Sequence, residues 1–233
     1  ADVDVETLTF GVSGGTDNGT TVTKVGTYGT LTVNKSSGAY SYTKTASSIE
    51  ALDDSESGVD SFTFTVSDGD DALVDQGYTV TVSGADDQPT LNTVAAGTIA
   101  EDRLATTTTS AGLSGTLSAA DVDVETLTFG VSGGTDNGST VTKVGTYGTL
   151  TVNKSSGAYS YTKTASSIEA LDDSESGVDS FTFTVSDGDD ALVDQGYTVT
   201  VSGADDQPTL NTVAAGTIAE DRLATTTTSA GLS

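Results

Sequence analysis

The sequence predicts an all-β protein made of tandem antiparallel β-sandwiches. Apolar residues alternate with threonine and other polar residues in short runs, turns rich in glycine and aspartate separate these runs, and the whole pattern occurs twice. Alternation with a period of two is typical of half-buried strands. Residues 1–10 recur at 120–129, so the repeat period is 119 residues, and Thr20 and Ser139 are the one paired position that differs. A period this long indicates an array of domains rather than a solenoid.

Seven strands are expected in the complete unit. They cover residues 90–95, 113–117, 127–131, 147–152, 158–163, 181–185 and 197–201. The strands over 147–152 and 158–163 are expected to pair across a short loop with a glycine available for a left-handed position. Seven short strands joined by Gly- and Asp-rich loops predict a sandwich of immunoglobulin-like type.

One short helical turn is expected between the fifth and sixth strands. Ser166 and Glu169 match a capping box, in which the side chains at the two positions satisfy each other's backbone N–H groups. The turn is expected to place Ile168 and Leu171 toward the core.

Two joints divide the chain. Residues 84–91 return unchanged at 203–210, and each copy holds one of the two prolines, Pro89 and Pro208. Proline cannot donate a ladder hydrogen bond and favours extended backbone before it, which suits a stiff link between domains. We expect residues 1–87 to form a β-sandwich unit without its first strands, residues 88–206 a complete unit, and residues 207–233 the opening segment of a further unit.

The sequence begins and stops inside a unit, which gives an expectation about partners. Residues 1–86 lack the segment that precedes them in the repeat, and residues 208–233 are an opening segment without a body. Both would expose apolar strand edges. We therefore expect residues 208–233 to pack onto the first unit of a neighbouring chain, by strand exchange.

Composition excludes several classes of function. The net charge of −26, from 34 acidic and 8 basic residues, argues against binding to nucleic acid or anionic membranes, and divalent cations are natural partners. The absence of cysteine excludes disulfides and thiolate metal sites. No apolar run approaches the length of a membrane span, so no membrane insertion is expected. With no histidine and no cysteine, and no evident cleft, enzyme activity is not expected.

The acidic loops are expected to gather at the two ends of each sandwich. If successive strands alternate in direction, the loops with Asp121 and Asp123 and with Asp187 and Asp189 lie at one end. The opposite end then holds Glu101, Asp102, Asp172, Asp173, Glu175, Asp205 and Asp206. Stacking units end to end brings carboxylates from two domains together at each joint, and Ca²⁺ takes six to eight oxygen ligands of this kind. The turn at Asp68, and its copy at Asp187, is interpreted as a hairpin turn rather than a site of its own.

Three motifs carry a resemblance to a known family. They are Tyr28-Gly29-Thr30-Leu31-Thr32-Val33-Asn34, the run from Phe62 to Gly69, and the joint from Gly84 to Pro89. Together they resemble the VCBS-type, cadherin-like repeats of large bacterial adhesins, which are RTX proteins exported by type I secretion. The resemblance implies calcium between domains, with Asp86 where a cadherin has asparagine and Ser55 where it has glutamate. It implies these ligands: Asp53, Asp54 or Glu56 with Asp86, Asp87, Asp121 and Asp123 at the first joint, and Glu101, Asp172, Asp173 or Glu175 with Asp205 and Asp206 at the second.

The function expected first is therefore a structural extender on the bacterial cell surface. Identical units stacked end to end and rigidified by calcium would hold a distal domain away from the cell, for attachment and biofilm formation. Two alternatives stay open: a module that binds a ligand or self-associates, and a filament or sheath subunit that exchanges strands. The alternatives predict, respectively, exposed aromatic side chains and assembly through the open ends.

Overall fold

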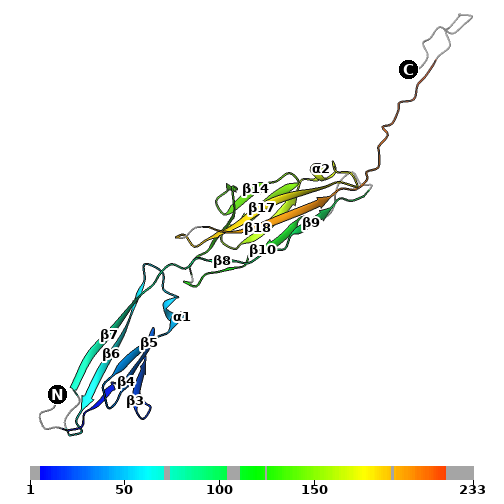
Figure 1. Cartoon of the computed structure of the whole chain (residues 1–233). Coiled ribbons are helices and arrows are strands. Elements are labelled where there is room, and N and C mark those ends of the chain that lie inside the picture. The colour runs from blue at the N-terminus through cyan, green and yellow to red at the C-terminus, as the bar shows by residue number, and fades with distance from the viewer. Residues whose placement is uncertain (1–5, 71–73, 104–110, 124, 190–191, 219–233) are drawn as a thin grey trace, which may run out of the picture.

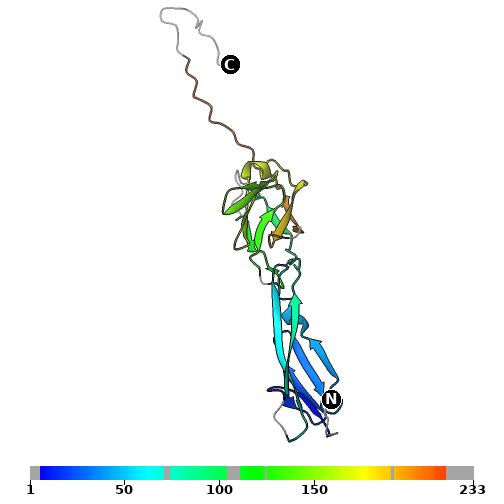
Figure 2. The same ribbon diagram turned by 90° about the vertical axis from the view of Figure 1, so that its left-hand side faces the viewer.

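The computed structural model describes residues 6–70, 74–103, 111–123, 125–189 and 192–218. The two units of the repeat lie end to end and form an elongated molecule (Figure 1). Residues 207–218 run away from the second unit as an extended segment, and a view turned by 90° shows the same arrangement (Figure 2). Within the described ranges, no helix is long and apolar enough to cross a membrane.

The second unit is a sandwich of two main sheets. In chain order its strands are β8 (Thr90–Leu91), β9 (Gly97–Ala100), β10 (Leu113–Thr116), β11 (Ala119–Ala120), β12 (Thr128–Val131), β13 (Thr135–Asp136), β14 (Thr140–Val144), β15 (Gly148–Asn153), β16 (Ala158–Lys163), β17 (Ser176–Ser186) and β18 (Val193–Ser202). One sheet has the order β10-β16-β15-β14-β13 and the other β12-β17-β18-β9, while β8 pairs with β11. The β9–β18 pair is parallel, and the other pairs of this unit are antiparallel.

The first unit repeats the body of this sandwich without the opening strands. Its strands are β1 (Thr9–Val12), β2 (Thr16–Asp17), β3 (Thr21–Val25), β4 (Gly29–Asn34), β5 (Tyr40–Lys44), β6 (Ser57–Ser67) and β7 (Val74–Ser83). They form sheets of order β1-β6-β7 and β2-β3-β4-β5. The register is the same in both units, since Phe10 lies opposite Val66 as Phe129 lies opposite Val185. Among the described residues, β7 and β5 therefore remain edge strands.

The hairpin between β15 and β16 shows how the sequence sets this register. Asn153 Oδ1 accepts hydrogen bonds from the N–H groups of Ser155 (3.1 Å) and Ser156 (2.9 Å), and Gly157 turns the chain at φ +66°. A positive φ favours glycine because it has no Cβ. Leu150 and Tyr161 then lie opposite each other as a cross-strand pair that faces the core.

A buried carboxylate connects the two sheets of each unit. Asp179 on β17 accepts hydrogen bonds from the N–H groups of Thr146 (2.7 Å) and Tyr147 (3.0 Å), which lie between β14 and β15. It also accepts one from the Tyr161 hydroxyl on β16 (2.7 Å). Asp60 makes the same contacts in the first unit. A buried charge is tolerated only when it is paired or hydrogen-bonded, and three donors satisfy this one.

The core of the second unit lies between its two sheets. It includes Phe183, Val185, Val199 and Val201, all fully buried, and ring contacts join Phe183 to neighbouring tyrosines. The opening segment contributes Ile99 and Leu117, each 4% exposed. The sequence expectation of an all-β, immunoglobulin-like sandwich is confirmed.

Each unit contains one short helix, α1 (Ala46–Ile49) and α2 (Ala165–Ile168). The capping-box assignment was wrong, because Ser166 lies inside α2 and the N-cap residue is Thr164, whose side chain makes no capping hydrogen bond. The inward position of Ile168 is confirmed, since its side chain is fully buried, and Leu171 packs against the same core.

The strand expectations also need correction at several places. The first strand was expected over residues 90–95, but β8 ends at Leu91. The strands β9 and β14 were not expected, and β9 lies in a stretch interpreted as a polar loop. Both are short, and their pairing partners rather than their own sequence give them strand structure.

Candidate metal centre

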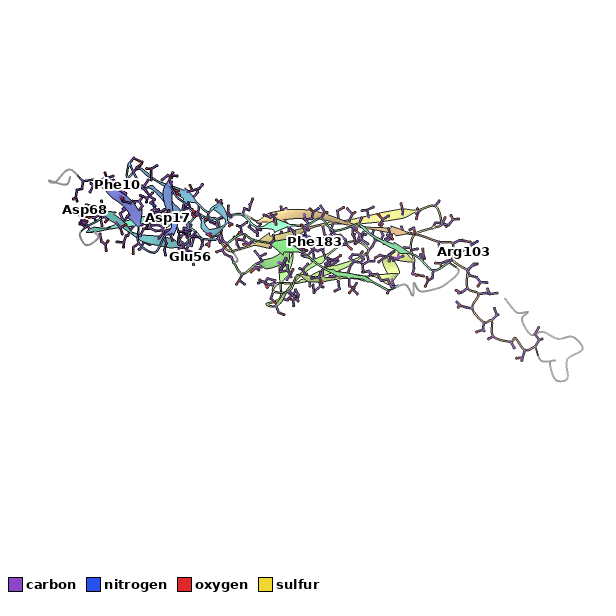
Figure 3. All side chains as sticks on the ribbon, turned by 90° about the horizontal axis from the view of Figure 1, so that it is seen from below. Phe10, Asp17, Glu56, Asp68, Arg103 and Phe183 are labelled. Carbon is purple, nitrogen blue, oxygen red and sulfur yellow. The ribbon has the colours of Figure 1, made fainter. Side chains whose placement is uncertain are left out.

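The chain passes between the units through residues 84–89. The Gly84 N–H donates to the Glu56 carbonyl (3.0 Å), and the Ala85 N–H donates to the Leu52 carbonyl (3.2 Å). These bonds fasten the start of the linker to the loop between α1 and β6. Figure 3 labels Glu56 in the first unit, with Asp68 at that unit's outer end and Arg103 toward the outer end of the second unit.

The linker also contacts the second unit. The Asp87 N–H donates to Asp123 Oδ2 (2.7 Å), and the Asp123 N–H donates to Asp121 Oδ1 (2.8 Å). The second bond closes a local turn in which an aspartate side chain caps the backbone two residues ahead. The run from Asp121 to Glu125 is thereby folded against the linker.

Carboxylates of both units converge at this point. Asp53 and Asp86 from the first unit and Glu125 from the second each place one carboxylate oxygen within 4.8 Å of the others. Asp121, Glu125 and Asp187 form a second group with the same spacing. Because Glu125 belongs to both groups, the five residues form one continuous set, here named the joint cluster.

Asp187 lies in the turn between β17 and β18, and the geometry of this turn brings it to the joint cluster. Asp187 Oδ1 accepts a hydrogen bond from the Asp189 N–H (3.0 Å), and Gly188 between them has φ +127°. A left-handed glycine lets the turn close tightly. The interpretation as a hairpin turn is compatible with a role for Asp187 alongside Asp121 and Glu125.

The joint cluster is electrostatically strained. Asp121 Oδ2, Asp123 Oδ1 and Glu125 Oε2 are buried, and none has a hydrogen-bond partner among the described residues. Loss of hydration, together with the negative charges of Asp53, Asp86, Asp189 and Asp121, raises the pKa of Glu125 to about 7. A buried acceptor without a donor costs about 1–3 kcal/mol, so a cation beside these three oxygens would offset that cost.

A second cluster lies at the outer end of the second unit. Glu101, Glu169 and Asp206 each place a carboxylate oxygen within 4.8 Å of the others, and they are here named the outer cluster. Glu101 is 7% exposed; its Oε2 accepts from the Ala204 N–H (2.8 Å), while its Oε1 has no hydrogen-bond partner in the described part of the chain. Burial raises the pKa of Glu101, the Ala204 N–H opposes this, and the charges of Asp206 and Glu169 add to it.

A polar hollow of about 270 Å³ lies beside the outer cluster. It is lined by Glu169, Leu171, Asp172, Asp205 and Asp206, together with Ala170 and Ala204. Asp172 and Asp205 are exposed on its rim. The hollow faces away from the second unit, where a further unit would continue the array.

The structure brings together only some of the residues that the sequence indicated. Asp53, Asp86 and Asp121 belong to the joint cluster, Asp87 and Asp123 are hydrogen-bonded beside it, and Glu101 and Asp206 belong to the outer cluster. The remaining predicted residues lie outside both clusters: Asp54, Glu56, Asp102, Asp172, Asp173, Glu175 and Asp205. Glu175 Oε2 accepts from the Asp172 N–H (3.1 Å), and Asp172 Oδ1 accepts from the Asp173 N–H (2.8 Å). Their role as ligands stays a prediction.

Sequence reasoning missed Glu125, Glu169 and Asp187 as members of the clusters. The spacing Asp121-Val122-Asp123-Val124-Glu125 contained a signal for the first, because its three acids recur at every second position. Glu169 had been assigned to the capping box. Asp187 had been placed at the correct end of the unit but assigned to a turn.

The donors of both clusters fit a calcium ion. They are carboxylate oxygens, the ligands that hard divalent cations prefer, and several are buried without a hydrogen-bond donor. Thiolate and imidazole ligands are absent from the sequence, which has no cysteine and no histidine.

Cadherin ectodomains are among the solved structures that match this chain. Human CDH23 EC21-23 shares 16% identity with a TM-score of 0.39, covering 84% of this chain and 58% of its own. Protocadherin Gamma B2 domains 3-6 share 15% with a TM-score of 0.37, covering 85% and 42%, and mouse Cadherin-23 EC22-24 shares 14% with a TM-score of 0.35, covering 86% and 53%. The chain thus spans about half the length of these structures. No curated protein sequence matches it.

The family model described as a bacterial cadherin-like domain matches residues 86–203, which is half of the chain and covers the whole second sandwich. Domains of this kind are extracellular adhesion modules rather than enzymes, and they typically bind Ca²⁺ at the linkers between domains. The chain belongs to the bacterial cadherin-like domain family, as a tandem, non-enzymatic module of an extracellular protein.

Proposed function

We propose that the chain is a stretch of a structural extender in a bacterial cell-surface adhesin, with calcium rigidifying each joint. The convergence of Asp53 and Asp86 from one unit with Glu125 from the next supports this proposal most directly. In this function the stacked units hold a distal binding domain away from the cell and serve attachment and biofilm formation. The resemblance to VCBS-type repeats supports an RTX adhesin exported by type I secretion.

Calcium at the first joint is held by the joint cluster. Asp53, Asp86 and Glu125 bridge the two units, and Asp121 and Asp187 extend the set on the second unit. The ion supplies the positive charge that these acids lack, and its binding to oxygen atoms of both units restricts the hinge between them. Without a cation, carboxylates within 4.8 Å of one another repel, and the joint loosens.

The residues proposed for the second joint supply the other half of the same design. The outer cluster supplies Glu101, Glu169 and Asp206 from the end of the second unit. Asp172, Asp173, Glu175, Asp205 and Asp102 are proposed to complete the ligand set there. A joint between two complete units therefore combines the residues of the outer cluster with counterparts of Asp121, Glu125 and Asp187 from the next unit. The first joint is proposed to include Asp54, Glu56, Asp87 and Asp123 in the same way.

The repeat itself suits a spacer. Only Thr20 and Ser139 differ between the paired positions, so length rather than surface variety distinguishes one stretch of the array from another. We assign residues 1–87 to an open unit, 88–206 to a complete unit and 207–233 to the next opening segment. Calcium that binds only the ordered joint stabilises it by about 2.7 kcal/mol at a hundredfold excess over Kd.

The partners of the extender are identical repeats stacked end to end, and no interaction with nucleic acid or membranes is proposed. The partners also include a neighbouring chain, whose first unit accepts residues 208–233 by strand exchange. Residues 219–233 of this segment lie outside the described residues.

The alternative function, a ligand-binding module, requires exposed aromatic rings. Tyr40 is 56% exposed, but its counterpart Tyr159 is half-buried beneath the opening segment, so a complete unit does not present this ring.

The test is thermal unfolding combined with small-angle scattering, with calcium and with chelator. Calcium is expected to raise the melting temperature and to lengthen the maximum dimension, because a hinged pair of units becomes a rod. Glu125→Gln removes the carboxylate shared by both groups and is expected to weaken both effects, whereas Glu6→Gln, the exposed counterpart of Glu125 in the first unit, is the matched control. Identical curves with calcium and with chelator would contradict the proposal.

A further inference from the structure

The outer face of the sheet β10-β16-β15-β14-β13 carries a row of hydroxyl side chains in register. Thr135 pairs with Thr142, Thr142 with Thr151, Thr151 with Ser160, and Ser160 with Ser114. The residues on either side of Thr151 along β15 are buried in the core, so the row points away from the core. Hydroxyl groups therefore cross the whole width of the sheet on its solvent side.

This face, here named the hydroxyl face, carries no charge on its five strands. Its outward positions hold threonine and serine, with one valine, one alanine and one asparagine. The charged residues of these strands are Asp136, Lys143 and Lys163, and they occupy the alternate positions, such as Lys143 opposite the core residue Leu150. An uncharged face of this width contrasts with the net charge of −26 on the chain.

The hydroxyl face is a property of the repeated body, because the first unit has it as well. Its row runs from Thr16 through Thr23 and Thr32 to Ser41. A valine lies beside the row in each unit, Val144 at 75% exposure and Val25 at 72%. Each unit therefore presents the same uncharged face.

Threonine alone gives no reason to expect a partner, since it is common at outward strand positions. The missing charge and the exposed valine are the informative features, because opposite charges paired across strands often stabilise a solvated face. The outer face of the other sheet differs, since the exposed Asp194 on β18 lies there opposite Thr184. The hydroxyl face is thus the better candidate for an interaction surface.

We propose that the hydroxyl face binds the same face on a second copy of the chain, so that arrays associate side by side. A second copy has the same net charge of −26, so two copies approach most easily where neither surface is charged. A hydroxyl group both donates and accepts hydrogen bonds, which makes a hydroxyl face complementary to itself. This contact goes beyond the extender function, because it uses neither the joints nor calcium.

The size of the face explains why it would occur in every unit. Strands lie about 4.8 Å apart and rise about 3.4 Å per residue, so five strands of five residues cover about 400 Å². A stable interface buries about 800 Å² on each partner, so one face gives only weak association. Faces on successive units bind with increasing strength, because the first contact raises the effective concentration of the next.

The first test measures association by sedimentation at rising concentration, in chelator so that calcium has no part in it. The double variant Val25→Asp with Val144→Asp places a charge on the hydroxyl face of each unit and is expected to weaken association about tenfold or more. The matched control is Val59→Asp with Val178→Asp, since both valines are 54% exposed and lie on the other sheet. The control is expected to associate like the unmodified chain.

This comparison separates the contact from the functions proposed above. Strand exchange leaves both pairs of valines outside the contact and would give equal association of the two variants. Equal association, or a chain that stays monomeric at all concentrations, would overturn the proposal. An effect of calcium on the melting temperature is independent of either result, so failure of the extender function is recognised separately.

The second test uses charges of opposite sign at the middle row. One variant carries Ser41→Lys with Ser160→Lys, and the other carries Ser41→Asp with Ser160→Asp; both serines are exposed. At low ionic strength each variant alone is expected to associate more weakly than their equimolar mixture, because like charges oppose each other across the contact. The same changes at Ser61 and Ser180, exposed on the other sheet, provide the control. A mixture at the hydroxyl face that gains no more than the control mixture would contradict face-to-face binding.

The third test varies salt. Raising NaCl from about 20 mM to about 300 mM screens repulsion between the acidic ends and is expected to strengthen association severalfold. Ion pairs hold no part of the proposed contact, so nothing in it is lost. Association that weakens with salt would show a charged interface and overturn the proposal.

Discussion

The two units have almost the same sequence but bury it to different extents. Phe183, Tyr197 and Val199 lie inside the second unit, whereas their counterparts Phe64, Tyr78 and Val80 are half-buried. Fourteen buried residues make up the core of the second unit, and four make up that of the first, counted over the described residues. The body sequence therefore sets the strands and their register, while the opening segment decides whether the core is closed.

The same contrast appears in the ionisation of paired tyrosines. Burial, and then the hydrogen bond to Asp60, raises the pKa of Tyr42 to about 12. Burial and the bond to Asp179 raise the pKa of Tyr161 as well, and its side chain is more deeply buried. Identical hydrogen bonds thus lie in environments of different polarity, because Leu113 and Leu117 cover the second unit alone.

The largest expected effect comes from truncating a matched core residue in each unit. Phe183→Ala should destabilise the second unit by about 3–5 kcal/mol, because it leaves a cavity in a closed core. Phe64→Ala should cost the first unit roughly 1–2 kcal/mol, because the ring is only partly buried. Urea unfolding followed by circular dichroism measures both values, and equal losses would show that the first unit is closed in solution.

Calcium should distinguish the two joints. Asp53→Asn should weaken calcium binding at the first joint about tenfold, which removes about 1.4 kcal/mol of the stabilisation. Asp172→Asn changes the counterpart residue at the outer end of the second unit, and it should reduce the calcium-dependent shift in melting temperature by less than Asp53→Asn does, because an ion there does not bridge two described units. In chelator, Asp53→Asn should raise the melting temperature, since it relieves repulsion. A melting temperature in calcium that is insensitive to Asp53→Asn would exclude this residue as a ligand.

Unfolding at low pH should report on the Asp60 carboxylate, which connects the two sheets of the first unit. Burial opposes ionisation of Asp60, but hydrogen bonds from Tyr42, Thr27 and Tyr28 outweigh it and hold the pKa below the usual 3.8. The ionised carboxylate therefore stabilises the first unit above pH 3.8, and this contribution is lost as pH falls through the lower folded pKa. Asp60→Asn should lower the free energy of unfolding by about 1–3 kcal/mol at neutral pH. It should also make the free energy of unfolding fall less steeply at acidic pH. Near-ultraviolet circular dichroism as a function of pH measures the acid unfolding curve of each protein. An identical curve for Asp60→Asn and the unmodified chain would show that other groups cause acid unfolding.

The smallest effect should come from the position where the units differ. Thr20→Ser makes the first unit match the second, and both side chains are exposed. Stability should change by less than about 0.5 kcal/mol. Hydrogen exchange of buried amides measures how well each core is closed. If the difference between the units disappeared with this substitution, residue 20 rather than the opening segment would be its cause.

Sequence patterns predicted the long strands well and the short ones poorly. Phe181, Phe183 and Val185 alternate, and they lie on β17 as expected. In β14, Val141 and Val144 fall on opposite faces and Val144 is 75% exposed, so alternation gives no signal there. The strand β9 has one buried side chain, Ile99, and pairs with residues about a hundred positions later, which local patterns cannot show.

The ends of the units were easier to predict than the ligands within them. Alternating strand directions placed Asp53 and Asp86 opposite Asp121, and the structure brings them to one joint. Which of several adjacent acidic residues joins a cluster depends on the local backbone conformation. Contacts such as the hydrogen bond from the Asp87 N–H to Asp123 fix this conformation. The three missed members, Glu125, Glu169 and Asp187, reach their clusters through such local geometry.

The parallel pairing of β9 with β18 has a mechanical consequence. The chain enters the second unit shortly before β9 and leaves directly after β18, so tension along the array pulls these two strands in opposite directions along their common axis. The hydrogen bonds from Gly97 to Ala100 are then loaded together in shear, and they must break as a group rather than one after another.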